Sequence, residues 1–145
     1  MIRAQLNQSI LKGGQRLPHK KLQRVLEVCG QALGVRKEMM VSIGFVSASQ
    51  MRKLNHAWRG KDRVTDVLSF GLDEGSLKGE IVLCYEQAVV QAREMDHSTR
   101  DELLFLLVHG ILHLWGYDHE VQQDAKKMFP LQEKILKQLM IDPRL

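Results

Sequence analysis

The sequence predicts an α+β fold, a single compact domain over residues 1–145 in which helices cover a small mixed β-sheet. A chain of 145 residues suffices for one domain that buries about two thirds of its unfolded surface. Short runs with strand periodicity are interspersed with longer runs of helical periodicity. One helix, over residues 100–115, is apolar on nearly all sides. It should therefore be the buried helix, and it should hold His109 and His113 rigidly.

In the first half of the chain, the sequence patterns predict two strands and two helices. Pro18 suits the first turn of a helix, and Gly34 ends the run of apolar residues at helical spacing that follows it. Apolar and small residues alternate over 41–45, which is typical of a half-buried strand. Ser47 and Gln50 have the form of a capping box. We expect a weak strand over 4–11, a helix over 18–34, a strand over 41–45, and a short helix that turns Met51, Leu54 and Trp58 inward.

In the second half of the chain, the sequence patterns predict a pair of strands followed by three helices. The β-type runs 67–70 and 80–84 are separated by a loop over 71–79, which is too short for a crossover helix. The two strands should therefore be antiparallel if they pair. Thr99 and Glu102 form a second capping box. The expected helices span 85–95, 100–115 and 121–140, and Pro130 should kink or restart the last of them.

Positive charge is concentrated in the first half of the chain. Residues 1–63 hold 13 lysines and arginines against 3 acids, whereas residues 64–145 hold 8 against 14, within a net charge of +4. A basic cluster can be a merely solvated surface, but here the basic groups extend over several elements. This distribution favours a polyanion such as RNA as the partner.

The sequence predicts neither a targeting segment nor a membrane span. The N-terminal residues lack the apolar stretch of a signal peptide, and the longest apolar run, 103–108, is too short to cross a bilayer. Cys29 and Cys84 lie far apart within apolar patterns, so both should be small core residues. We expect a soluble, cytoplasmic protein that does not bind membranes.

Residues 109–119 contain a candidate metal site. His109 and His113 are four residues apart, which on a helix places both side chains on one face, about 6 Å apart along the axis. Gly116 can take the left-handed conformation that reverses the chain, so His119 should return to the pair. Three neutral imidazoles, with a fourth position left for water, are typical of a catalytic zinc site. We predict that His109, His113 and His119 hold one Zn²⁺ per chain.

The spacing H-x-x-x-H-x-x-G-x-x-H matches the ligand spacing of metzincin proteases, but one residue departs from their pattern. In H-E-x-x-H proteases a glutamate follows the first histidine and takes the proton from the attacking water. Here that position is Gly110. The usual protease base is therefore missing, and another group or the substrate must manage the proton.

Residues 109–119, which read HGILHLWGYDH, resemble the H-G-x-L-H-L-x-G-Y-D-H signature of the YbeY family of bacterial ribosomal RNA maturation factors. Residues 54–62 and 65–70 are similar to the second block of this family, and residues 79–82 to its third. The resemblance covers about residues 40–120. The eleven-residue signature is highly specific, whereas the other blocks would be weak alone.

The resemblance implies a zinc-dependent, single-strand-specific endoribonuclease. Members of the family act in ribosomal RNA processing, including maturation of the 16S rRNA 3′ end, and in ribosome quality control. The partners it implies are single-stranded RNA, ribosomal RNA and ribosomal particles. It assigns the metal to the three histidines and makes Arg59 the catalytic residue that helps to bind or cleave RNA.

Three positions depart from the family pattern. Trp58 stands where Tyr or Phe is usual, Glu80 where Asp is usual, and Gly71 where Pro is frequent. None of them is a predicted ligand, so the departures concern the local geometry of the second and third blocks and leave the metal prediction unchanged.

The expected reaction is metal-assisted hydrolysis of a phosphodiester. The ion would polarise a phosphoryl oxygen or supply hydroxide, while the planar charged fork of Arg59 offsets charge on the phosphorane oxygens. Lys61 and Arg63, which follow Arg59 in a basic loop, are candidates for positioning phosphates.

Other polar residues near these motifs have smaller expected roles. Tyr117 and Asp118 should shape the turn, and Asp118 could accept a ring N–H from a ligand histidine. Thr65 and Ser69 could equally be ordinary strand residues or line the site. The histidines outside the ligand spacing, which we expect on the surface, are His19, His56 and His97.

Two other classes of function remain open. A non-catalytic RNA-binding ribosome assembly factor, with a structural zinc holding the turn, fits the charge distribution equally well. A metallopeptidase shares the ligand spacing, but Gly110 removes its base and the basic half has no evident use in peptide cleavage.

Overall fold

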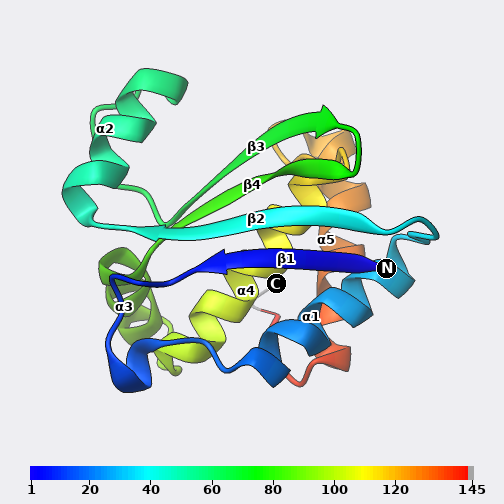
Figure 1. Cartoon of the computed structure of the whole chain (residues 1–145), viewed down its shortest axis with the longest axis horizontal. Coiled ribbons are helices and arrows are strands. Elements are labelled where there is room, and N and C mark those ends of the chain that lie inside the picture. The colour runs from blue at the N-terminus through cyan, green and yellow to red at the C-terminus, as the bar shows by residue number, and fades with distance from the viewer. Residues whose placement is uncertain (144–145) are drawn as a thin grey trace.

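A computed structural model describes residues 1–143, in which four strands and five α-helices follow one another (Figure 1). Residues 144 and 145 of the predicted domain lie outside the described part. The strands are β1 (Ile2–Asn7), β2 (Met39–Val46), β3 (Val67–Glu74) and β4 (Leu77–Cys84). The helices are α1 (His19–Ala32), α2 (Ala48–Arg59), α3 (Tyr85–Glu94), α4 (Thr99–Leu114) and α5 (Gln122–Gln138). Within residues 1–143, no helix combines the length and apolar character that crossing a membrane requires.

The strands form one mixed sheet in the order β1-β2-β4-β3. β1 is parallel to β2 and β2 is parallel to β4, whereas β3 is antiparallel to β4. This confirms the α+β class, the mixed sheet and the antiparallel pair predicted from the sequence. β3 is an edge strand, so one side of its backbone is available to groups that approach from outside the sheet.

Helices cover both faces of the sheet, but unequally. Side chains alternate between faces along a strand. In β4, Ile81 and Leu83 join the large core with α1, α4 and α5, whereas Val82 and Cys84 join a smaller cluster with Met51 of α2. α2 therefore packs on the opposite face, across the sheet from α1, α4 and α5 (Figure 1).

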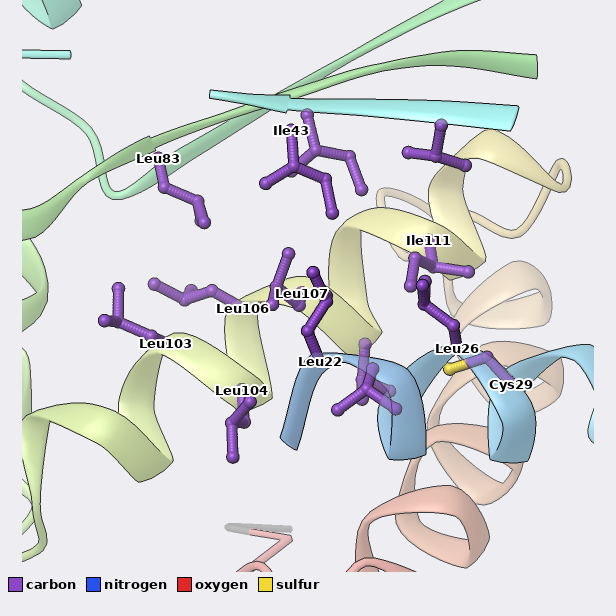
Figure 2. Close-up of a cluster of buried hydrophobic side chains, with 14 of the residues drawn as sticks. Leu22, Leu26, Cys29, Ile43, Leu83, Leu103, Leu104, Leu106, Leu107 and Ile111 are labelled. Carbon is purple, nitrogen blue, oxygen red and sulfur yellow. The ribbon is translucent and has the colours of Figure 1, made fainter. Parts of the chain in front are cut away.

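The large core is built around α4. Figure 2 shows Leu107 and Ile111 of α4 between the strands, which carry Ile43 and Leu83, and the side chains of α1. The predicted buried helix is thus confirmed, as is the burial of both cysteines. Removal from water raises the pKa of the Cys29 thiol to about 12.

Two strand boundaries differ from the prediction. β1 spans Ile2–Asn7 rather than 4–11, because the backbone pairs with β2 from Ile2 onward. Most of the segment 71–79, predicted as a loop, is strand on either side of a turn at Gly75, whose φ is 61°. Gly71 and Gly79, which resemble loop glycines in the sequence, face each other across β3 and β4.

Two helix predictions also need correction. Ser98, and not Thr99, caps α4: its hydroxyl accepts a hydrogen bond from the Asp101 backbone N–H at 3.1 Å. α5 is one helix through Pro130, so of the kink and the restart predicted there, the restart does not occur. The capping box of Ser47 at the start of α2 is confirmed.

Trp58 is not turned inward as predicted. Burial decreases along α2, from Met51, which is fully buried, through the half-buried Leu54 to Trp58, which is 66% exposed. The helical spacing of the three residues is real, but the C-terminal end of α2 lies at β3, the edge strand, where Trp58 contacts the Phe70 ring. The last apolar residue of the series is therefore covered on one side and stays mostly in solvent.

Candidate metal centre

α4 and the turn that follows it bring three histidines together. His109 and His113 project from one face of α4, and the chain reverses at Gly116, whose φ of 94° suits glycine. The Gly116 N–H donates to the His113 carbonyl at 3.0 Å and closes the end of the helix. His119 returns to the pair, and the three ligand nitrogens all lie within 4.8 Å of one another.

The donor atoms of this cluster fit a small metal ion. Nε2 of His109 lies 3.0 Å from Nε2 of His113 and 3.2 Å from Nε2 of His119. A neutral imidazole carries one N–H and one lone pair, so each ring that keeps its proton on Nδ1 can direct the lone pair of Nε2 to this point. Nitrogens bound to one tetrahedral zinc ion at about 2.0–2.1 Å are roughly 3.4 Å apart, close to the observed separations. These three imidazoles could therefore hold a metal.

Gln132 of α5 orients the first of these rings. Its Oε1 accepts a hydrogen bond from Nδ1 of His109 at 2.8 Å, and the Gln132 side chain is buried. This contact assigns the ring proton to Nδ1 and leaves Nε2 with its lone pair. No local pattern in the sequence indicates Gln132, because only the packing of α5 against α4 brings it to His109.

Aromatic side chains hold two of the imidazole rings in place. Phe105 stacks on His109 with ring centres 6.4 Å apart and planes at 11°, and Phe129 stacks on His119 at 5.7 Å and 20°. A ligand set restrained in this way loses little side-chain entropy when it binds an ion.

The protonation state of the cluster also suits metal binding. Burial lowers the pKa of His109 to about 4, against the smaller opposing effect of the hydrogen bond with Gln132. Burial likewise lowers the pKa of His113, and the nearby charge of Arg59 acts in the same direction. Both rings are therefore neutral at pH 7, the state in which imidazole binds metals.

Arg59, the last residue of α2, reaches the same site from the edge of the sheet. Its Nη2 donates to the Ser69 carbonyl of β3 at 2.8 Å, and its Cζ lies 5.3 Å from the centre of the Phe70 ring. These contacts hold an exposed guanidinium at the edge strand, near His113. The structure thus brings Arg59 to the predicted metal ligands.

A buried asparagine shapes the basic loop that follows α2. The Nδ2 of Asn55, which is 3% exposed, donates to the Arg63 carbonyl at 2.9 Å. Arg52 binds Asp62 through two contacts of 2.8 and 3.2 Å, so the acid of this loop is already paired. Lys61 and Arg63 remain exposed beside the cleft.

A chain of polar groups leads from the half-buried Asp66 at the cleft to the buried Glu102 inside the protein. Asp66 accepts the Val67 backbone N–H at 2.7 Å and the Gln91 amide at 2.8 Å, and the same Gln91 nitrogen donates to Glu102 at 3.0 Å. The fully buried Glu102 pairs with His97 at 2.9 Å. His97, predicted on the surface, is therefore largely buried, because this carboxylate needs a partner.

Of the three histidines predicted on the surface, His19 and His56 are both exposed, so the prediction is confirmed for these two.

Asp118 accepts the backbone N–H of His119 at 2.7 Å through Oδ1, and thus shapes the turn as expected. No ring N–H contact of Asp118 is seen among the described residues; Gln132 has that role for His109.

The cluster opens into a cleft of about 540 Å³. Its walls include the three histidines, Arg59, the basic loop and the polar residues at the start of β3. Thr65 and Ser69 both line it, and Ser69 Oγ also donates to the Gly110 carbonyl of α4 at 3.4 Å. A larger cavity of about 880 Å³ lies between β1 and α1 and is lined by none of the three cluster histidines.

Comparisons of the sequence with known proteins match this chain to members of one family. A family model described as "Endoribonuclease YbeY" matches residues 6–140. The chain is similar to endoribonuclease YbeY of Salinispora tropica, with 44% identity over 131 residues that cover 77% of this chain and 83% of that protein. It is 39% identical to endoribonuclease YbeY of Ureaplasma urealyticum over 126 residues, covering 84% and 81% of the two chains.

A solved structure supports the fold. The solution structure of a Thermotoga maritima protein matches with a TM-score of 0.63 and 35% sequence identity, over 96% of this chain and 89% of that chain. The match therefore extends beyond the segment 40–120 in which the sequence motifs lie.

Proposed function

Since the chain belongs to the endoribonuclease YbeY family, we propose that it is a zinc-dependent, single-strand-specific endoribonuclease, acting as a single domain, in ribosomal RNA processing. The observation that carries this proposal is the convergence of three imidazole nitrogens within 4.8 Å at a cleft whose wall bears Arg59. The proposed substrate is single-stranded ribosomal RNA within ribosomal particles in the cytoplasm. Maturation of the 16S rRNA 3′ end and ribosome quality control are the proposed roles.

In this proposal His109, His113 and His119 hold the zinc, each through Nε2. A bound zinc ion supplies a Lewis acid for phosphoryl oxygens and lowers the pKa of water to about 7. The protein supplies the remaining features. Gln132 keeps the His109 tautomer that presents Nε2, and the lowered pKa of His109 and of His113 keeps these two rings neutral.

Arg59 is the proposed catalytic residue, and the geometry explains how it would act. The Ser69 carbonyl and the Phe70 ring hold one end of the guanidinium, so the fork is positioned before the substrate binds. A planar cation of this kind can bind two phosphate oxygens at once and offset charge that develops on them in the transition state. Lys61 and Arg63 would position neighbouring phosphates along the strand.

The test compares cleavage of single-stranded RNA by the zinc-loaded protein and by three variants. His113→Ala should lose both the zinc, measured by elemental analysis, and the cleavage. Arg59→Ala should keep the zinc and lose on the order of 10²–10³ in rate, as for removal of one group that stabilises transition-state charge. His19→Ala, which changes an exposed histidine outside the cluster, should match the unaltered protein.

Other outcomes would point to other functions. Cleavage of an unfolded protein, lost in His113→Ala, would identify a metallopeptidase. RNA binding without any cleavage would identify an assembly factor with a structural zinc. Ribonuclease activity that survives in His113→Ala would come from a contaminant and would refute the proposal.

A further inference from the structure

We propose that Trp58 is a stacking platform for an unpaired base of the RNA substrate, located next to the catalytic cleft. This inference rests on the proposed ribonuclease function and names one element of its substrate specificity. Stacking on the exposed indole requires a base whose face is accessible. A base-paired strand does not offer such a face, so this contact would select unpaired bases.

The first argument is the exposure of the side chain. Trp58 is 66% exposed, although an indole is among the largest apolar groups that a protein can bury. It belongs to the inward series of Met51 and Leu54 by spacing, yet it lies outside the apolar cluster that these two residues share with β3 and β4. An aromatic ring left in water by an otherwise regular amphipathic helix is available for a ligand.

The second argument is that the ring is held in place. Trp58 contacts Phe70 of β3 with ring centres 6.0 Å apart and planes at 69°. This edge-to-face contact restrains the indole without covering it, since most of the residue stays exposed. A restrained ring loses little entropy when a base stacks on it.

The third argument is the distance to the catalytic cleft. The same Phe70 ring carries the guanidinium of Arg59 at 5.3 Å, so the centre of the indole and Cζ of Arg59 are at most about 11 Å apart. Arg59 lines the cleft of the three histidines. A base stacked on Trp58 would therefore belong to a nucleotide close to the one whose phosphate meets Arg59.

The charge around Trp58 favours RNA over a protein as the occupant. Arg59, Lys61 and Arg63 are exposed beside the cleft, and the acid of the loop, Asp62, is already bound by Arg52. Proteins that bind single strands combine such a cationic groove with aromatic rings on which bases stack, and this contact does not depend on base identity. We therefore expect binding of unpaired strands with little sequence preference at this position.

The experiment measures binding rather than cleavage. Full-length, zinc-loaded protein is titrated into a fluorescein-labelled, single-stranded 2′-O-methyl RNA oligomer whose integrity is checked after the titration, and anisotropy gives Kd. Trp58→Leu keeps an apolar side chain without a ring, and Trp58→Phe keeps a smaller ring. Val90→Ala, at an exposed apolar residue of α3, is the control.

We expect Trp58→Leu to raise Kd by roughly 5- to 100-fold, the range for loss of one stacked base, and Trp58→Phe to raise it less. The dependence of Kd on salt should stay unchanged, because no cation is removed. On an oligomer of the same length that carries abasic residues, the unaltered protein and Trp58→Leu should bind equally.

Two results would overturn the inference: Trp58→Leu that binds the oligomer as the unaltered protein does, or an equal loss on the abasic oligomer. Cleavage is assayed separately with unmodified RNA. If the unaltered protein cleaves RNA but Trp58→Leu binds normally, stacking fails while the nuclease proposal stands. If the stacking effect is found without cleavage by any preparation, the nuclease proposal fails while the base contact stands.

Discussion

Replacing Gln132 tests whether a residue outside the histidine motif sets the metal affinity. Gln132 is 1% exposed, and its Oε1 accepts the Nδ1 proton of His109 at 2.8 Å. In Gln132→Met a side chain of similar length fills the space but offers no strong acceptor. The His109 ring then loses the contact that fixes its tautomer and orientation.

The expected magnitude follows from this single contact. Loss of a hydrogen bond to a metal-binding histidine typically weakens metal affinity by about 10- to 100-fold, or roughly 1.4–2.7 kcal/mol. The metal-free protein should also lose on the order of 1–3 kcal/mol of unfolding free energy, because a buried N–H is left without an acceptor. Gln132→Glu keeps an acceptor, so it should bind the metal at least as tightly as the unaltered protein.

The assay is competition for zinc with a chromophoric chelator, combined with urea unfolding of the metal-free proteins. Gln138→Met, at an exposed position of the same helix, is the matched control and should change neither quantity. Zinc affinity of Gln132→Met within twofold of the unaltered protein would refute the role of Gln132. An equal loss in Gln132→Glu would also refute it, since the acceptor is retained there.

Two further predictions concern stability. Gly79→Ala should lose about 3 kcal/mol in urea unfolding, the upper end of overpacking costs, because the added Cβ would collide with the Phe70 carbonyl and lie 2.5 Å from Cδ2 of Leu114. Gly71→Ala, across the same strand pair, meets no atom within 4 Å and should lose under about 1 kcal/mol; equal losses would contradict the clash. In the metal-free protein, the pKa of His109 is about 4 whereas an unfolded histidine titrates near 6.5, so the unfolded chain takes up the proton first. The unfolding free energy should therefore fall by up to about 3 kcal/mol as pH decreases from about 6.5 to 4, and this slope should be smaller in His109→Gln; parallel curves would contradict it.

Local patterns predicted the features that depend on near neighbours in the chain. The spacing of His109 and His113 is a property of one helix, and the reversal at Gly116 is a property of one turn, so the cluster could be expected from eleven residues. The antiparallel pairing of β3 with β4 followed from the short connection between them. In the same way, Ser47 predicted the start of α2.

The features that sequence reasoning missed depend on packing between distant elements. Gln132 and Asn55 are buried polar residues whose partners are set by how α5 and the loop after α2 fold back, and no local periodicity encodes that. His97 was misplaced for the same reason, because its partner Glu102 is buried only once α3 and α4 pack together. Trp58 shows the reverse error, since helical spacing identifies a common face but not where the supporting sheet ends.

Gly110 affects both the packing of α4 on the sheet and the set of side chains available at the histidine cluster. A Cβ at this position would lie 3.1 Å from Ser69 Oγ and 3.2 Å from two methyl carbons of Ile81, so glycine lets α4 approach the sheet closely. This approach places the histidines beside β3, whose Ser69 carbonyl also holds Arg59. A glutamate at 110, the protease base, would not fit without moving Ser69 or Ile81, because its Cβ alone would already be in tight contact with both side chains. The residue that stands in place of the peptidase base is thus also one that lets α4 pack closely against β3, the strand on which the Arg59 guanidinium rests.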